Sequence, residues 1–185
     1  MRARAEETRR YGTPVGALTG WRYCPRCASS LRLEPGHARC PECGYTQWAA
    51  PSPAVGAFAL DDDGRILLAR RAFEPDAGKW DSVGGFLEED EEPVAGLERE
   101  LLEETGLVGA VGDFVGGFVD TYGDGADARY ALNLVWEVRI SDGEPVPADD
   151  VSELRWFDKD ELPPDDELAF RWLAPALRSW AARLD

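Results

Sequence analysis

Three glutamates in the middle of the chain have the side-chain type and the spacing needed to bind a cation. Glu103 and Glu104 follow Glu100 by three and four residues, so on an α-helix the three carboxylates share one face. Like charges at this spacing repel one another, and a counter-charge is therefore expected. Mg²⁺ and Mn²⁺ prefer oxygen ligands and are commonly held by a few carboxylates together with substrate phosphates. Taken alone, the same glutamates also fit a solvated acidic face of a surface helix.

Four cysteines nearer the N-terminus form a second set with the spacing of metal ligands. Cys24 and Cys27 make one Cys-x2-Cys pair, and Cys40 and Cys43 make another. Two such turns supply four thiolates to a tetrahedral Zn²⁺ of the structural kind. The alternative is four free or disulfide-paired thiols. We predict a zinc ribbon that depends on its metal to fold, in which His37, the one histidine of the chain, is an exposed loop residue.

The helix that must carry the glutamates is predicted over residues 93–104. Pro93 suits its first turn and Gly106 is expected to stop it. The apolar stripe that this helix would bury against a sheet consists of Val94, Leu97 and Leu101.

The remaining elements alternate between strand and helix, which predicts an α/β core with helices covering a mixed sheet. Pro51-Ser52-Pro53 is interpreted as a boundary, because proline resists the interior of both helix and sheet. Pro175 should break or kink a second, amphipathic helix over residues 167–184. Strands are predicted over residues 55–60, 66–69, 108–119, 131–140 and 155–157.

The composition excludes several classes of function. The 36 Asp and Glu against 20 Lys and Arg give a formal net charge of -16, which repels nucleic-acid backbones and anionic membranes. No stretch approaches the roughly 18 apolar residues that span a bilayer, and the charged N-terminus is unlike a signal peptide. A cytoplasmic protein with reduced thiols is therefore expected, with no nucleic-acid or membrane partner.

The segment around the glutamates resembles the Nudix box at every defined position. The pattern runs from Gly85 through Glu91 and Arg99-Glu100-Leu101 to Glu103-Glu104, Gly106 and Leu107. Similarity to Nudix flanking segments extends over residues 54–169. The resemblance implies a Nudix α/β/α sandwich over residues 52–185, preceded by a zinc ribbon over 21–48 and a leader over 1–20.

The resemblance also implies roles for the box residues in a metal-dependent hydrolase. Glu100, Glu103 and Glu104 would bind Mg²⁺ or Mn²⁺, helped by the backbone carbonyl of Gly85. Arg99 and Glu91 would form the pair that braces the loop against the helix.

The identity of the general base is left open by the sequence. Within the helix Glu103 is the first candidate, and Glu153 and Asp150 are candidates on a later loop, where solvated acids are the alternative.

The substrate contacts are predicted less sharply. Arg70 and Arg71 can meet phosphates, although adjacent strand residues point to opposite faces. Trp80 and Phe86, like Tyr122 and Tyr130, can stack on a base, and core packing is the alternative for each.

The overall likeness is to zinc-ribbon Nudix proteins that act on ADP-ribose, FAD or NADH, although the Ser-Gln-Pro-Trp array of NADH pyrophosphatases is not found between residues 106 and 127. The rival reading is a non-catalytic nucleotide sensor or protein-binding module. The expected partner is a small nucleotide, and a homodimer is left open.

Overall fold

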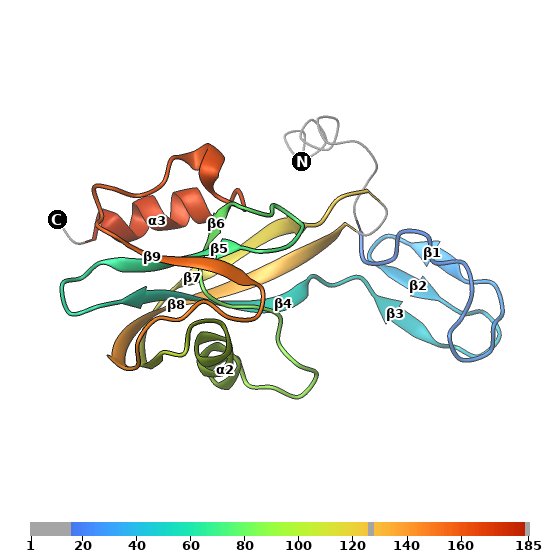
Figure 1. Cartoon of the computed structure of the whole chain (residues 1–185). Coiled ribbons are helices and arrows are strands. Elements are labelled where there is room, and N and C mark those ends of the chain that lie inside the picture. The colour runs from blue at the N-terminus through green and yellow to red at the C-terminus, as the bar shows by residue number, and fades with distance from the viewer. Residues whose placement is uncertain (1–15, 126–127, 184–185) are drawn as a thin grey trace. The chain divides into compact units, whose positions relative to one another are not determined.

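The structure, a computed structural model, describes residues 16–125 and 128–183. It divides into two compact units (Figure 1). One holds the described residues up to Pro51 together with Thr121–Tyr130, and the other holds Ser52–Asp120 and the chain from Ala131 onwards. Most of the expected leader lies outside the described residues, and its last four residues form a turn.

The larger unit is built on a six-stranded mixed sheet, as predicted for the fold class. Its strands are β4 (Ser52–Leu60), β5 (Ile66–Arg71), β6 (Trp80–Asp81), β7 (Val108–Tyr122), β8 (Arg129–Asp142) and β9 (Val151–Phe157). Their order is β6-β5-β4-β8-β7, and β9 pairs with β5. The long central pair β4–β8 is parallel, whereas β5 is antiparallel to β4, β6 and β9.

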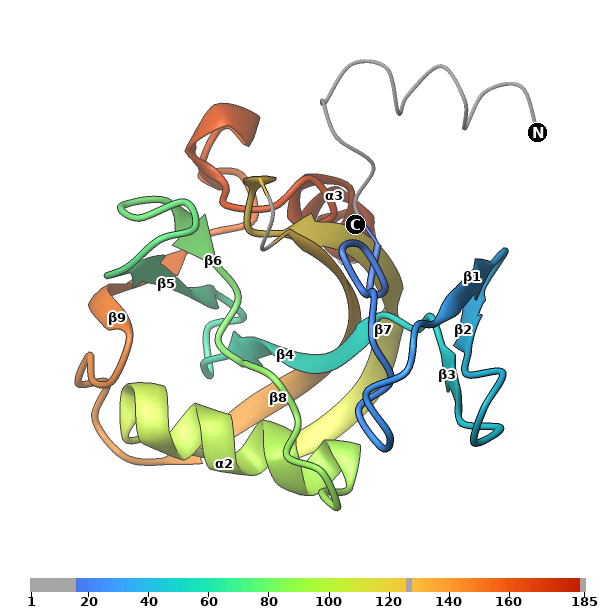
Figure 2. The ribbon, with the colours of Figure 1, turned by 90° about the vertical axis from the view of Figure 1, so that its right-hand side faces the viewer.

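Helices α2 (Pro93–Thr105) and α3 (Leu173–Ala181) lie on opposite sides of this sheet (Figure 2). Alternate residues of β4 serve the two layers, because successive strand side chains point to opposite faces. Phe58 and Leu60 pack with the α3 core, whereas Ala57 and Ala59 pack with the α2 core. The fully apolar character of β4 therefore reflects burial on both faces.

Helix α2 has the expected ends. Pro93 is its first residue, and Gly106 ends it in the left-handed conformation with φ 71°. Leu97 and Leu101 are buried against the sheet. Val94 is 42% exposed, so the predicted apolar stripe is shorter than expected and begins one turn later.

The expectation of a boundary at Pro51-Ser52-Pro53 is only partly right, because β4 begins at Ser52. Pro53 lies opposite Leu132 in the parallel ladder. A parallel ladder uses the N–H of alternate residues for a given neighbour, so one proline near the start of a strand leaves the pairing intact.

The helix predicted over residues 167–184 is wrong in its first third. A 3-10 turn (Asp165–Glu167) and bends precede α3, which starts at Leu173. Pro175 therefore lies in the first turn of α3 and not in its middle. A proline there removes an N–H that has no partner within the helix, so it starts the helix and does not kink it.

The smaller unit contains a three-stranded antiparallel sheet in the order β1-β2-β3, formed by β1 (Arg32–Glu34), β2 (His37–Arg39) and β3 (Thr46–Trp48). His37 lies on β2, so the expectation of an exposed loop residue is wrong. Its ring stacks on Trp48 across the strands, with centroids 4.7 Å apart. Among the described residues, no helix is both long enough and apolar enough to cross a membrane.

Candidate active site and metal centres

The double glycine before α2 brings the backbone into close contact with β4 and with the helix. Gly84 has φ 140°, and a Cβ there would lie 2.2 Å from the carbonyl oxygen of Val55. Its N–H donates to the Glu104 carboxylate at 2.8 Å. Glycine is required at this position because any side chain would collide with the β4 backbone.

Gly85 lies directly against the first glutamate of the box. A Cβ on Gly85 would come within 2.6 Å and 2.8 Å of the two carboxylate oxygens of Glu100. The Gly85 carbonyl accepts a hydrogen bond from Val55 N–H at 2.9 Å. A carbonyl oxygen has two lone pairs, so this contact leaves one acceptor position for another ligand.

Arg99 joins the loop to the helix, and the ion pair expected with Glu91 is present. Its Nε and Nη2 donate to the two Glu91 oxygens at 2.7 and 2.8 Å. Its Nη1 donates to Glu100 at 2.9 Å and to Glu103 at 3.0 Å. The hydrogen bonds from Arg99 lower the pKa of Glu91 to about 2. One guanidinium therefore sets the orientation of three carboxylates.

The three glutamates of the helix face differ sharply in burial. Glu104 is buried, the side chain of Glu100 is 12% exposed, and that of Glu103 is 53% exposed. Burial raises the pKa of Glu104 to about 10 and also raises the pKa of Glu100. A charged carboxylate at the two inner positions therefore calls for a cation close by.

The loop before β9 brings Asp150 to the same place. Ala148 N–H and Val146 N–H donate to the carbonyls of Glu104 and Thr105 at 3.0 and 2.9 Å, and so cap the end of α2. The carboxyl group of Asp150 hydrogen-bonds to that of Glu104.

A small pocket opens at this point, lined by residues from β5, β6, the double-glycine loop, α2 and the loop before β9. Its polar lining residues are Arg71, Asp81, Ser82, Glu104 and Asp150.

The other loop candidate for the general base is held elsewhere. Glu153 pairs with Arg70 at 2.9 Å and with Arg155 at 2.8 Å. Its carboxylate is therefore occupied by two guanidinium groups on β5 and β9.

The two arginines at the end of β5 point to opposite faces, as their adjacency predicts. Arg71 lines the pocket, where its Nη1 lies 3.3 Å from Asp81 and its Nε donates to the Pro75 carbonyl at 2.8 Å. Burial raises the pKa of Asp81 to about 6. Arg70 instead lies over the ring of Trp80, with its guanidinium carbon 4.4 Å from the ring centroid.

The aromatic residues expected at the substrate are placed differently from one another. Trp80 is 1% exposed and lies between Arg70 and Arg155 in the α3 core, so it has no ring face free for a base. The expectation that Trp80 contacts substrate is therefore dropped. Phe86 is half-buried beside β4, bridging to Ala54.

One exposed aromatic near the pocket was missed by the sequence reasoning. Phe73 is 65% exposed on the loop that follows β5. The N–H of its neighbour Ala72 donates to the Asp150 carbonyl at 2.7 Å, so the pairing with the β9 side continues past Arg71. Alternation from Arg71 places Phe73 on the pocket side, a signal that the two-residue period of β5 already contained.

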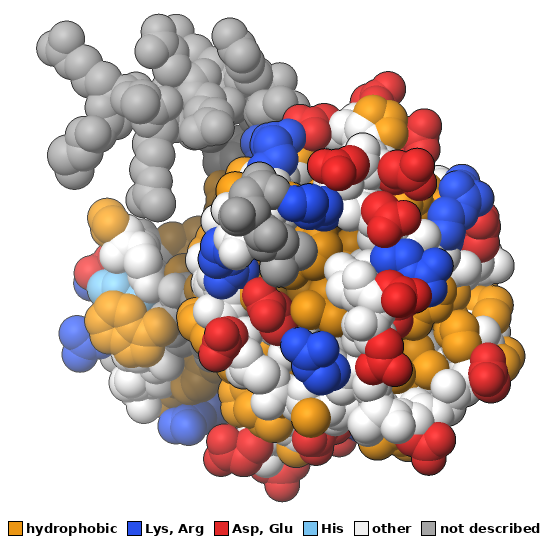
Figure 3. All heavy atoms as spheres, turned by 90° about the vertical axis from the view of Figure 1, so that its left-hand side faces the viewer, with side chains coloured by type: hydrophobic (Ala, Val, Ile, Leu, Met, Phe, Trp, Pro, Cys, Tyr) orange, Lys and Arg blue, Asp and Glu red, His pale blue; other side chains and the backbone are white. Residues whose placement is uncertain are grey.

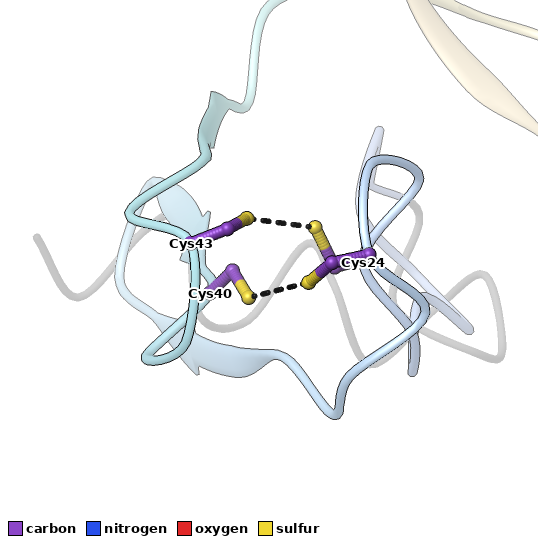
Figure 4. A group of neighbouring side chains, drawn as sticks. Cys24, Cys40 and Cys43 are labelled. Atoms are coloured by element: carbon purple, nitrogen blue, oxygen red, sulfur yellow. Dashed lines mark hydrogen bonds between the residues drawn. The ribbon is translucent and has the colours of Figure 1, made fainter.

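The four cysteines of the smaller unit converge as a metal site requires (Figure 4). Cys24 Sγ and Cys43 Sγ are 3.5 Å apart, as are Cys27 Sγ and Cys40 Sγ, and all four sulfurs lie within 4.8 Å of one another. These are not disulfide distances, which are about 2 Å. Four sulfurs about 2.3 Å from a central zinc would be about 3.8 Å apart, so the donor set fits Zn²⁺.

The comparison with known families decides the classification. The sequence model of the NUDIX domain matches residues 50–178, which is most of the chain and includes the glycine loop, α2 and the loop before β9. The chain belongs to the Nudix family.

Several curated Nudix relatives show sequence similarity to this chain. It is 33% identical over 105 residues to a MutT-like protein of Streptomyces ambofaciens, covering 57% of this chain and 62% of that protein. It is 32% identical over 113 residues to an ADP-ribose pyrophosphatase of Methanocaldococcus jannaschii, covering 61% and 65%. An NAD-capped RNA hydrolase of Pseudomonas aeruginosa is 28% identical over 141 residues, covering 74% of this chain and 47% of that one. The chain thus spans about half to two thirds of these relatives.

Solved structures show the same fold. A Nudix hydrolase from Nitrosomonas europaea superposes with a TM-score of 0.71 at 24% identity, covering 88% of this chain and 91% of that one. A MutT protein from Methanosarcina mazei gives a TM-score of 0.60 at 22% identity, over 73% and 96%.

The Nudix box residues fit a hard cation by chemistry, although their carboxylates are less tightly gathered than the thiols. Among the described residues, only the four cysteines bring their ligand atoms within 4.8 Å of one another. The box glutamates instead contact Arg99, Gly84 and each other's neighbours. Three carboxylates and a free carbonyl acceptor are the oxygen donors that Mg²⁺ takes. The exposed Glu103 side chain has room to rotate from Arg99 toward the inner pair.

Proposed function

We propose that this Nudix protein hydrolyses the pyrophosphate bond of a nucleoside diphosphate derivative with the help of Mg²⁺ or Mn²⁺. The observation that carries the proposal is the single helical turn with Glu100, Glu103 and Glu104, held by Arg99 and faced by the double glycine. A solvated acidic face does not account for this arrangement, since two of the three carboxylates are buried.

The residues divide the work of the reaction among them. Glu100, Glu104 and the Gly85 carbonyl would hold the cation, and Arg99 fixes the angle of Glu100. When bound, the cation supplies neutralisation of the diphosphate charge and a lower pKa for the attacking water. Glu103, the exposed member, accepts the proton of that water. The water oxygen bonds to one phosphorus, the bridging P–O bond breaks, and the two products are phosphate monoesters.

The substrate class follows from the relatives and from the pocket. ADP-ribose, FAD and NADH are the candidates, and support comes from the similarity to an ADP-ribose pyrophosphatase. Arg71 is placed at the pocket beside Glu104, where a guanidinium can meet a second phosphate. Arg70 is tied to Glu153 on the other face and is left out of the set.

Glu103→Gln tests the enzyme assignment with a change of one charge and almost no change of size. The rate on ADP-ribose, FAD or NADH in Mg²⁺ should fall by about 10² or more, because general bases contribute about 10²–10⁴-fold. The measurement is release of mononucleotide, followed by chromatography. Glu98→Gln is the matched control, since Glu98 is exposed on the same helix and should leave the rate unchanged.

Two results would separate the enzyme from the nucleotide sensor. Turnover by wild type that is lost without Mg²⁺ and in Glu103→Gln supports hydrolysis. Tight binding of the same nucleotides with no turnover by wild type would support the sensor and contradict the proposal.

We further propose that Cys24, Cys27, Cys40 and Cys43 bind one Zn²⁺ in a ribbon over residues 21–48, ahead of a Nudix domain over residues 52–185. The convergence of the four sulfurs supports this assignment. Hydrogen bonds from Ser29 lower the pKa of Cys27 to about 6, which favours the thiolate form that zinc requires.

A further inference from the structure

The exposed face of the β1-β2-β3 sheet has a surface that the pyrophosphohydrolase activity does not use. The register aligns Glu34, His37 and Trp48 in one row across the strands. Alternate strand residues share a face, so the next row on the same side consists of Arg32, Arg39 and Thr46. An aromatic row and an arginine row therefore lie side by side, about 7 Å apart.

The aromatic row is available to a ligand. Trp48 is 65% exposed and is braced from one side by the ring of His37 at 4.7 Å. Figure 3 shows the pale blue imidazole beside a large hydrophobic side chain, with basic side chains around them. The opposite face of the sheet carries Ala38, which is fully buried, so the two faces are sharply different.

The charge of this region is opposite to that of the rest of the chain. Residues 1–51 contain eight Arg and four Glu, whereas residues 52–185 contain 32 acidic and 12 basic residues. The argument from net charge against nucleic acid therefore averages two unlike regions. It holds for the Nudix domain, which repels phosphate, but not for the cysteine-bearing module.

We propose that this face, defined by Arg32, Arg39, His37 and Trp48, binds single-stranded RNA. An exposed tryptophan with a free ring face stacks on an unpaired base, and arginines one row away meet the phosphates. A protein partner would more commonly bury apolar side chains in this row, whereas half of the six positions here are charged.

Binding is measured by fluorescence anisotropy with the zinc-loaded full chain and a labelled 12-nucleotide single-stranded RNA. The RNA carries a 5′-hydroxyl and contains no pyrophosphate, so it is not a substrate of the proposed reaction. Wild type should bind in the range of about 1–100 µM that charge-driven RNA contacts give. Duplex RNA of the same length should bind more weakly, because its bases are not free to stack.

Two variants separate stacking from charge. Trp48→Ala should weaken RNA binding about fivefold or more, the loss expected for one stacked base, while its affinity for inorganic polyphosphate stays unchanged. Arg32→Gln with Arg39→Gln should weaken both ligands and reduce the salt slope by about 1.4, or 0.7 for each phosphate lost.

The controls keep folding and catalysis apart from RNA binding. Phe114→Ala removes an aromatic of similar exposure from the Nudix domain and should bind RNA like wild type. Each variant should retain its zinc and its rate on ADP-ribose.

Flat RNA titrations with wild type, or equal binding by Trp48→Ala and wild type, would overturn the proposal whatever the enzyme does. A Trp48-dependent dimer in sedimentation, with no RNA binding, would reassign the face to a second copy of the chain.

Discussion

At the scale of single residues, the three box glutamates are not equivalent. Helical spacing predicts that Glu100, Glu103 and Glu104 share a face, and they do. Spacing alone does not predict that Glu104 is buried under Gly84 while Glu103 remains exposed, because burial depends on the loop and on Asp150, which lies 46 residues further along the chain. The sequence therefore identifies the set, and the fold distinguishes its members.

The same limit applies to the aromatic candidates. Trp80, chosen from the sequence as a stacking residue, is covered by two arginines, and Phe73 is exposed beside the pocket. Both outcomes depend on long-range packing, since β9 and α3 close over Trp80.

Phe73→Ala should raise KM for ADP-ribose by about fivefold or more, because a lost base–aromatic stack weakens binding by about 1–3 kcal/mol. The turnover number should change little, since Phe73 does not touch the diphosphate. The measurement is steady-state kinetics on ADP-ribose and on 5-phosphoribosyl 1-diphosphate, which has no base. A parallel loss on both substrates would show that Phe73 only shapes the loop; Phe114→Ala is the control.

At the scale of elements, the strands and the box helix are predictable because their periodicity is local. Helix α2 begins at Pro93 and ends before Gly106, as the residues at its ends predict. The segment before α3 is not predictable in this way. Its apolar residues Leu168 and Trp172 are buried by packing on β6 and β7 rather than by a helical repeat, with Leu168 bridging to Trp80 and the Trp172 N–H donating to Asp120.

Gly84→Ala tests the contact between the glycine loop and β4. We expect a loss of about 3 kcal/mol or more in the free energy of unfolding, because the added Cβ meets the Val55 backbone and the φ of 140° is strained for alanine. Urea denaturation measures the change. Gly64→Ala has a similar positive φ but open space around it, and should lose only about 1 kcal/mol. Equal losses in the two variants would contradict the close approach.

At the scale of the whole molecule, the chain joins two units that are stabilised in different ways. The Nudix unit has two hydrophobic cores, one on each side of its sheet. In the described part of the smaller unit, the buried hydrophobic residues are Cys24, Ala38 and Cys40, so its stability depends on the four thiols.

Zinc removal should therefore unfold one unit and spare the other. After treatment with a strong chelator, peptides from residues 21–48 should exchange their amide hydrogens rapidly, whereas peptides from β4 and α2 should stay protected. Hydrogen exchange followed by mass spectrometry measures both at once. Unchanged protection over residues 21–48 in metal-free protein would show that the module folds without zinc.

Strand β5 also limits how this sequence can change. Arg70 leans on the indole beneath α3 and Arg71 reaches the pocket, so neighbouring positions serve opposite layers. One residue inserted or deleted upstream in this strand would exchange the two arginines, sending the pocket's cation into the hydrophobic layer and leaving the carboxyl of Asp81 without its partner. Substitutions here are open to natural variation, but a change of length is not.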